Sequence, residues 1–184
     1  MSIEEAPFEL VKKDDPFEIR DYASYIVAET FVEGDFEDAG SDAFKRLFGY
    51  ISGDNRARSE IAMTAPVSQA SGEKIAMTAP VGQAKSGDQW VVSFMMPASY
   101  TMETLPVPDD PRVTLRQVPA RRMAAVRYSG FWSEKNYRKN KLKLEKWIEK
   151  EGLEITGSPL WARYNAPFIP WFMRRNEVLF PIAM

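Results

Sequence analysis

The residues that most often carry enzyme chemistry are missing from this chain. Its 184 residues include no histidine and no cysteine. The chain therefore lacks the imidazole and the thiolate on which serine-type and cysteine-type hydrolases depend. It also lacks the usual ligands of zinc sites and the commonest axial ligand of haem iron.

Methionines and carboxylates remain as candidates for ligation or acid–base chemistry. Because thioethers fill irregular cores, we expect packing rather than metal ligation at Met63, Met77, Met95, Met96 and Met173. The acidic pairs Asp14-Asp15 and Asp109-Asp110 each adjoin a proline, which favours turns over a catalytic dyad. An enzyme would need a carboxylate or phenol inside a pocket, such as Glu60 or Tyr164. We rank that hypothesis last and expect no catalytic residues.

Charge and hydropathy argue against two classes of partner. The formal net charge is −2, which gives no general attraction to nucleic acid. Apolar positions and two glutamates interrupt the basic stretch Arg138 to Lys150, so we interpret it as a solvated helix face. No apolar run approaches the about 20 residues of a membrane helix, and Met1 to Glu5 does not resemble a signal peptide. With the absence of cysteine, this favours a cytoplasmic protein without a membrane span.

A wide apolar stripe on a predicted helix is the first sign of a binding surface. Apolar residues follow helical spacing between Asp35 and Gly53, and they surround more than half of the helix: Phe36, Phe44, Leu47, Phe48, Tyr50 and Ile51. Core packing explains most stripes of this kind. A stripe this wide predicts that one side is exposed, and exposed apolar patches usually mark binding.

A second apolar feature lies in a predicted loop. Six large apolar residues follow one another from Phe168 to Met173, although loops normally run over the surface. Two interpretations stay open. The segment is either a hydrophobic plug over one end of the fold or one wall of a binding site.

The elements that would position these features indicate an α+β domain. Helices are predicted from the N-cap Asp35 to Gly53 and from the N-cap Ser133 to Gly152. Strands are predicted where β-branched and aromatic residues gather: Phe8 to Val11, Glu18 to Tyr22, Tyr25 to Val32, Trp90 to Met96, Val113 to Val118, Arg122 to Tyr128, Glu154 to Tyr164 and Glu177 to Ile182.

Two internal repeats refine this prediction. IAMTAPVSQA (Ile61 to Ala70) recurs as IAMTAPVGQA (Ile75 to Ala84), which suggests two neighbouring strands of a hairpin. A shift of 97 residues also places Tyr25 to Ile51 on Arg122 to Ile148 with matching helix phase. We predict one domain over residues 1–184, with pseudo-two-fold β-β-α-β halves at about 8–97 and 112–184. The halves should form a curved antiparallel sheet or distorted β-barrel flanked by two helices.

Several segments resemble the SOUL haem-binding family in their order and spacing, and together they cover nearly the whole chain. They are EIRDYASYIVAET, GYISGDN, the two IAMTAPV copies, WVVSFMMP and RRNEV. The doubled MTAP motif resembles bacterial and plant members. The resemblance implies a two-fold pseudo-symmetric barrel with two helices, similar to the gyrase-inhibitor-like effector-binding domains, in agreement with the 97-residue shift.

The same resemblance implies a ligand and a site. Relatives bind haem or other tetrapyrroles, largely by apolar contact, against the first helix and a loop before the last strand. The corresponding positions are Ser41, Phe44, Phe48 and Gly49 on the helix and Pro170, Trp171, Phe172 and Met173 in the loop. We expect the ligand's propionates to meet rim arginines, with Arg46, Arg174 and Arg175 as candidates. Gly49 and Pro170 stand where a relative has lysine, and Ser41 where it has arginine.

These observations predict a non-catalytic carrier, buffer or sensor of haem or another tetrapyrrole, which would bind weakly to moderately without a histidine axial ligand. Two alternatives stay open. The apolar surface would otherwise meet a protein partner, or the chain would be a small-ligand effector-binding domain.

Overall fold

One large antiparallel sheet organises the molecule. A computed structural model of the chain describes residues 3–58 and 72–184. Nine strands follow the order β10-β4-β8-β7-β12-β13-β11-β3-β2. Their bounds are β2 Phe8–Asp14, β3 Phe17–Tyr22, β4 Tyr25–Val32, β7 Val81–Ser86, β8 Gln89–Met95, β10 Thr114–Val118, β11 Arg121–Tyr128, β12 Leu160–Arg163 and β13 Asn176–Pro181. Two short pairs join β1 (Glu4–Glu5) to β6 (Thr78–Ala79) and β5 (Asn55–Arg56) to β9 (Val107–Pro108).

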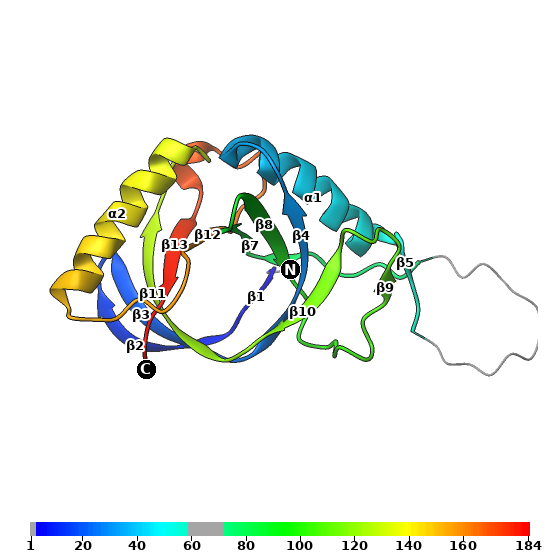
Figure 1. The fold of residues 1–184 in the computed structure, drawn as a ribbon, viewed down its shortest axis with the longest axis horizontal. Helices are drawn as coiled ribbons and strands as arrows, with labels where there is room; N and C mark the ends of the chain where they lie inside the picture. Colours follow the sequence, from blue (N-terminus) through cyan, green and yellow to red (C-terminus); the bar gives the residue numbers. More distant parts are fainter. Residues whose placement is uncertain (1–2, 59–71) are drawn as a thin grey trace, which may run out of the picture.

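Two helices of equal length cover one face of this sheet (Figure 1). Helix α1 (Phe36–Ser52) packs on β4 and β8, and α2 (Glu134–Lys150) packs on β11 and β13. Both helices begin where the sequence predicts. The Ser133 hydroxyl accepts a hydrogen bond from the Asn136 N–H at the start of α2, as an N-cap does. Gly53, at φ 126°, ends α1 in a conformation that a side chain disfavours.

The first turns of the two helices meet above the centre of the sheet. Figure 1 shows the helices diverging from this point. The Phe36 and Tyr137 rings stack with centroids 5.1 Å apart, and a Glu37 carboxylate oxygen accepts a hydrogen bond from the Glu134 N–H at 3.4 Å. The strands nearest this meeting point are β7 and β12, which pair with each other.

The strand order has a two-fold pattern, but the sheet does not close. Read inward from β10 it is β10-β4-β8-β7, and read inward from β3 it is β3-β11-β13-β12. A duplication origin for the two halves remains a prediction. Of the two predicted forms, a curved antiparallel sheet or a distorted β-barrel, the structure has the sheet: within the described residues β10 and β2 are free edges, and a barrel is not confirmed. Edge strand β2 carries Lys12 and Lys13 and shifts register between Leu10 and Lys12, and charges and bulges on an edge discourage further pairing.

One further sequence prediction needs correction, and another stays a prediction. Strand β7, which starts at the end of the second IAMTAPV copy, pairs with β8 and β12, and the predicted hairpin between the two copies stays untested. The first copy, Ile61 to Ala70, lies outside the described residues. The strand predicted from Glu154 to Tyr164 is shorter, because it begins only at Leu160. Gly157 and Pro159 interrupt the preceding segment, apart from one isolated bridge at Ile155.

The main core fills the space between the sheet and the helices. Phe36 contacts three aromatic rings there, those of Trp90, Tyr137 and Trp161. Trp161 and Leu144 are almost completely buried. Four residues of the predicted helix stripe are therefore part of the buried core: Phe36, Leu47, Tyr50 and Ile51.

The opposite face of the sheet holds a buried ion cluster. Arg20 donates two hydrogen bonds to Glu177, at 2.7 and 3.0 Å, and both residues are almost inaccessible to solvent. Tyr164 and Arg175 also donate to Glu177. Burial alone would raise the pKa of Glu177, but the Arg20 hydrogen bonds and the charges of Arg20 and Arg175 hold it below its ordinary value of 4.5.

We predict that Glu177→Gln lowers the free energy of unfolding by about 3 kcal/mol at pH 7, because it removes the buried carboxylate shared by Arg20 and Arg175 and leaves Arg20 with Glu18 alone. The control is Glu134→Gln, which removes the exposed pair with Arg138 and should cost under about 1 kcal/mol. Urea unfolding measures both.

The pH dependence follows from the lowered pKa. A carboxylate with a depressed folded-state pKa stabilises the protein above its unfolded pKa and loses that contribution as the pH falls through the folded value. The deficit of Glu177→Gln relative to wild type should therefore be constant from pH 7 to about pH 5 and shrink below the ordinary value of 4.5. Equal deficits at all pH values would contradict this account of the cluster.

Candidate functional site

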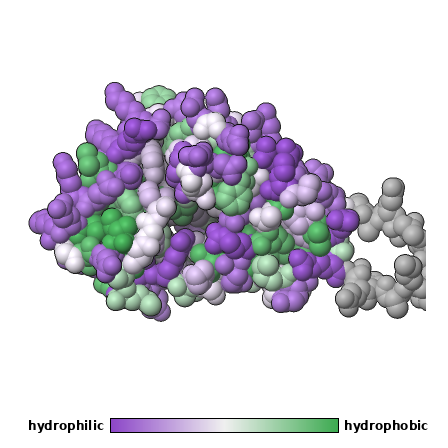
Figure 2. All heavy atoms as spheres, in the orientation of Figure 1, coloured by the Kyte–Doolittle hydropathy of each residue, from purple (hydrophilic) through white to green (hydrophobic). Residues whose placement is uncertain are grey.

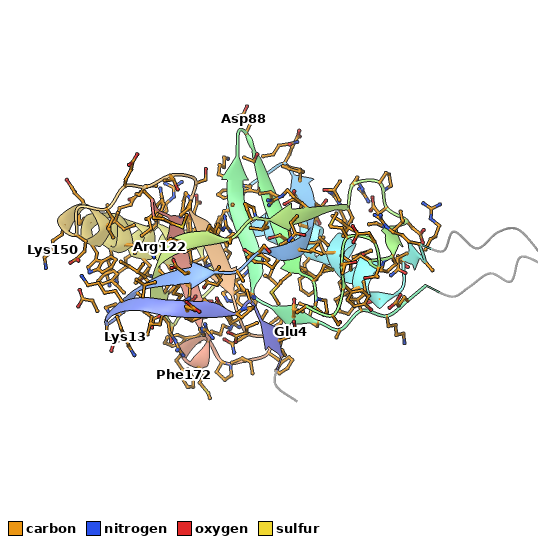
Figure 3. The ribbon with its side chains drawn as sticks, turned by 90° about the horizontal axis from the view of Figure 1, so that it is seen from below. Glu4, Lys13, Asp88, Arg122, Lys150 and Phe172 are labelled. Atoms are coloured by element: carbon orange, nitrogen blue, oxygen red, sulfur yellow. The ribbon has the colours of Figure 1, made fainter. Side chains whose placement is uncertain are left out.

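The loop before β13 presents exposed aromatic and thioether side chains. It contains the short 3-10 helix η1 (Trp171–Met173). Phe168 is 84% exposed, Phe172 60% and Met173 64%, and Figure 3 shows Phe172 at the edge of the molecule. Exposure of this extent rules out the plug interpretation of the segment. The loop is therefore an apolar surface with nothing packed over it among the described residues.

Neighbouring side chains extend this surface and fix its shape. Trp171 stacks on Phe131, from the segment before α2, with centroids 5.0 Å apart and planes 20° apart. The Gly130 N–H donates to the Trp171 carbonyl at 3.1 Å. Arg174 donates to the carbonyls of Ile169 and Pro167 at 2.8 and 2.7 Å. We call Phe131, Phe168, Trp171, Phe172 and Met173 the aromatic platform.

A tryptophan connects the aromatic platform to the sheet. The Arg174 guanidinium lies 4.3 Å from the centroid of the Trp132 ring. The Trp132 indole N–H donates to the Asn176 side-chain oxygen at 2.8 Å, and Asn176 is fully buried on β13. The loop is therefore held by cation–π and hydrogen-bond contacts, while its apolar side chains stay exposed.

The predicted helix positions lie along one flank of α1. Phe48 is 49% exposed and Phe44 is half-buried, and their rings stack at 5.8 Å while Phe44 also contacts Phe94 of β8. Ser41 is exposed on the same helix. Gly49 has a structural reason to be glycine: a Cβ there would lie 2.7 Å from an Asp54 carboxylate oxygen.

The two parts of the predicted site, the α1 flank and the aromatic platform, are separate in the part of the chain that the structure describes. Within the described residues, no aromatic contact joins Phe44 or Phe48 to Trp171 or Phe172; each pair contacts its own neighbours. Gly40, one turn before Phe44, is buried against the sheet. A Cβ on Gly40 would lie 3.2 Å from Gln83 Oε1 and 3.4 Å from both terminal nitrogens of Arg163, so this part of α1 packs tightly on β7 and β12. We use the name interhelical groove for the surface between the α1 flank and the aromatic platform.

The three predicted rim arginines already have partners. Arg46 donates to Thr30 Oγ1 and the Phe31 carbonyl at 3.4 and 3.3 Å, Arg174 holds the loop, and Arg175 pairs with Glu177 and Glu5. Sequence reasoning missed Arg163 instead. Arg163 could have been predicted to face inward from the strand sequence Leu160-Trp161-Ala162-Arg163, because period-two spacing puts it on the same face as a core tryptophan.

Two cavities lie away from the interhelical groove. One, of about 40 Å³, opens on the opposite face of the sheet beside Tyr22, Arg121 and Tyr164. The other, of about 310 Å³, shares Tyr25 and Met95 with it and extends towards Glu4 and Tyr100. Tyr164, a candidate in the enzyme hypothesis, donates to Glu177 at 2.9 Å, and burial raises its pKa well above the ordinary value. Tyr164 is therefore a protonated hydrogen-bond donor in the ion cluster, and its raised pKa does not suit a general base.

The methionines described by the structure mostly pack. Met95 and Met96 are buried, Met77 is half-buried against the core, and Met173 is exposed on the platform. Met63 and Glu60 lie outside the described residues. Within residues 3–58 and 72–184, no three acidic side chains gather as a metal site would require. In the same ranges, no helix is long and apolar enough to cross a membrane.

Comparison with known proteins identifies the family. The model of the SOUL heme-binding protein family matches residues 3–181. The chain belongs to the SOUL family. Among curated proteins, Heme-binding protein 1 of Xenopus tropicalis is 26% identical to this SOUL protein over 165 residues, which cover 89% of the chain and 82% of the relative.

Solved structures show the same fold at low identity. The EcmrR C-terminal domain superposes with a TM-score of 0.58 at 13% identity, covering 91% of this SOUL chain and 96% of that domain. A protein from Listeria innocua described as a hydrolase superposes at 0.56 with 15% identity, covering 94% of both chains. At these identities the likeness concerns the fold alone.

We predict that the aromatic platform binds a hydrophobic dye. Phe172→Ser should lower the fluorescence of bound anilinonaphthalene sulfonate, because it removes exposed apolar surface, and should change the free energy of unfolding by under about 0.5 kcal/mol. The control is Leu142→Ser, which alters another exposed apolar residue, on α2, and should leave the dye signal unchanged. Equal signals from Phe172→Ser and wild type would show that dye does not use this surface.

Proposed function

We propose that this SOUL protein binds haem or another tetrapyrrole without catalysis, as a carrier, buffer or sensor. The observation that carries the proposal is the aromatic platform, a rigidly held yet exposed apolar surface on a chain of a heme-binding family. Over the view in Figure 2, hydrophilic side chains predominate and hydrophobic ones gather in separate patches. Exposed apolar surface of this kind is typical of binding sites.

The ring would lie in the interhelical groove, between the aromatic platform and the exposed flank of α1 at Ser41, Phe44 and Phe48. From Gly40 to Phe48 the helix advances about 12 Å, a span that one porphyrin ring can bridge. Burial of the flat ring at about 25 cal/mol per Å² would supply most of the affinity, before the costs of association. We expect weak to moderate binding, because no iron–imidazole bond adds to the affinity.

The chain offers no imidazole to iron, since it contains no histidine. Water, tyrosine, methionine or lysine remain as iron ligands, or the protein supplies none. Two of these candidate ligands differ in their surroundings. Met173 is exposed on the platform, whereas Tyr164 donates a hydrogen bond to Glu177 on the opposite face of the sheet. This face separation also supports a protein without catalysis, since the buried acid–base groups lie away from the proposed ligand.

We predict that haem and iron-free protoporphyrin bind within about tenfold of each other, a difference of about 1.4 kcal/mol, because the affinity comes from the ring rather than from a protein–iron bond. Trp171→Ala should weaken both by about tenfold, and Leu142→Ala, an exposed apolar control on α2, should weaken neither. Titrations followed by the Soret band for haem and by quenching of tryptophan fluorescence for protoporphyrin measure the constants.

The outcomes separate the alternatives. Tight haem binding without protoporphyrin binding would mean that a protein–iron bond dominates, and this mechanism would fail. If neither ligand bound at micromolar concentrations, the platform would be better explained as the contact surface for a protein partner.

A further inference from the structure

The larger of the two cavities has the size of a small-molecule site. Its volume of about 310 Å³ lies at the lower end of the range of about 300 to 1,000 Å³ that is usual for ligand pockets. It opens beside the start of β4 and the end of β8, and segments far apart in the sequence line it, from β1 to β10. The chain therefore builds a second concave surface, separate from the interhelical groove.

Carboxylates are the charged groups of this lining. Among the described residues that line the cavity, Glu4 and Glu103 are acidic and none is lysine or arginine. A hydrogen bond from Thr101 lowers the pKa of Glu103, with the smallest contribution from the charge of Arg58, so Glu103 is ionised at neutral pH. Glu4 Oε1 accepts the Ala98 N–H at 2.8 Å, which fixes that carboxylate without neutralising its charge. The lining therefore attracts cations.

Two tyrosines line the same cavity and are held by their hydroxyl groups. Tyr25 Oη accepts a hydrogen bond from Arg121 Nη2 at 3.1 Å, and the Tyr100 hydroxyl donates to a Glu73 carboxylate oxygen. Arg121 itself lines the smaller cavity and not this one. Aromatic faces attract cations, most strongly cations that have lost their water. Rings held in place in this way favour a cation with an organic shell.

Thioethers form much of the remaining wall. Met95 and Met96 are buried, and Met102 is half-buried. Unbranched, polarizable thioethers adapt to apolar groups of different shape. An inorganic cation such as Ca²⁺ requires six or more oxygen ligands in place of its water, which two carboxylates and apolar walls do not supply. An alkylated ammonium ion carries its charge inside an apolar surface and suits this lining.

We propose that this cavity binds an apolar organic cation, an ammonium ion substituted with alkyl or aryl groups. The thioethers contact its apolar groups, Tyr25 and Tyr100 attract its charge, and the carboxylates of Glu4 and Glu103 offset that charge. The site is independent of the proposed tetrapyrrole site, because no residue of its lining belongs to the α1 flank or the aromatic platform. Figure 3 shows Glu4 apart from Phe172 of the platform.

The test compares phenyltrimethylammonium with tert-butylbenzene, which has the same shape and no charge. Protein labelled with ¹³C at its methionine methyl groups is titrated with each compound by NMR, and single Met→Leu variants assign the signals. Phenyltrimethylammonium should shift the signals of Met95, Met96 and Met102, which line the cavity, and not that of Met173 on the aromatic platform. The titration gives the dissociation constant and the place of binding together.

The decisive variant combines Glu4→Gln with Glu103→Gln, which keeps the shape of both side chains and removes their charge. It should weaken binding of the cation about tenfold, about 1.4 kcal/mol, and change binding of the neutral compound by less than about twofold. The matched control combines Glu149→Gln with Glu154→Gln, two exposed carboxylates outside the cavity lining. It changes the net charge equally and should leave both affinities as in wild type.

A second measurement needs no variant. Raising the salt concentration from 50 to 500 mM should weaken the cation several-fold and leave the neutral compound unchanged, because salt screens the attraction to exposed carboxylates. Trp171→Ala, which tests the tetrapyrrole site, should leave binding of the cation unchanged.

Three results would overturn the inference. They are no binding of phenyltrimethylammonium to wild type at millimolar concentration, shifts centred on Met173 in place of the methionines that line the cavity, and equal effects of the two double variants on the cation. Each of them would leave the proposed tetrapyrrole binding untouched, because that binding uses the other surface.

Discussion

The pairing of β7 with β12 is the constraint on which the rest of the molecule depends. It joins the strands of the two halves into one sheet, with Val81 opposite Arg163 and Gln83 opposite Trp161. Since α1 packs on β4 and β8 and α2 on β11 and β13, the helices are held on either side of this pair. Their first turns then meet above it, through Phe36 and Tyr137. The two helices therefore diverge from one central strand pair (Figure 1).

Charged side chains have different partners on the two faces of the sheet. On the face away from the helices, Glu177 satisfies Arg20, Arg175 and Tyr164 together, and a fully satisfied buried network rigidifies its surroundings. On the helix face, Arg163 has aromatic neighbours and no carboxylate among the described residues. Arg20 on β3 is therefore fully paired, whereas Arg163 on β12 contacts aromatic rings in place of a carboxylate among the described residues.

Local patterns predicted the elements well and the contacts between them poorly. Helix phase and capping predicted α1 and α2, and alternation predicted β4 and β11. The sequence left open whether the sheet closes, because closure depends on what β2 and β10 meet, and edge charges and a bulge oppose such pairing. The apolar loop was recognised from its composition, but the sequence left open whether it is a buried plug or a binding wall, and it did not identify Phe131 as its neighbour. The partners of Arg46, Arg174 and Arg175 could not be predicted from the sequence, because they come from β4, loop carbonyls and the ion cluster. Arg163 was overlooked although its alternation with Trp161 placed it inside.

The central claim is that a tetrapyrrole lies in the interhelical groove on the helix face of the sheet. The most direct measurement is amide NMR of the protein with and without one equivalent of paramagnetic ferric haem, compared with iron-free protoporphyrin. Paramagnetic broadening falls steeply with distance from the iron, so it locates the ring whatever its affinity. The account predicts broadening concentrated at Gly40 to Phe48, Phe131 and Trp132, and Phe168 to Arg174. Broadening centred on Tyr22, Tyr25, Arg121 and Tyr164 would place the ligand on the opposite face and contradict the account.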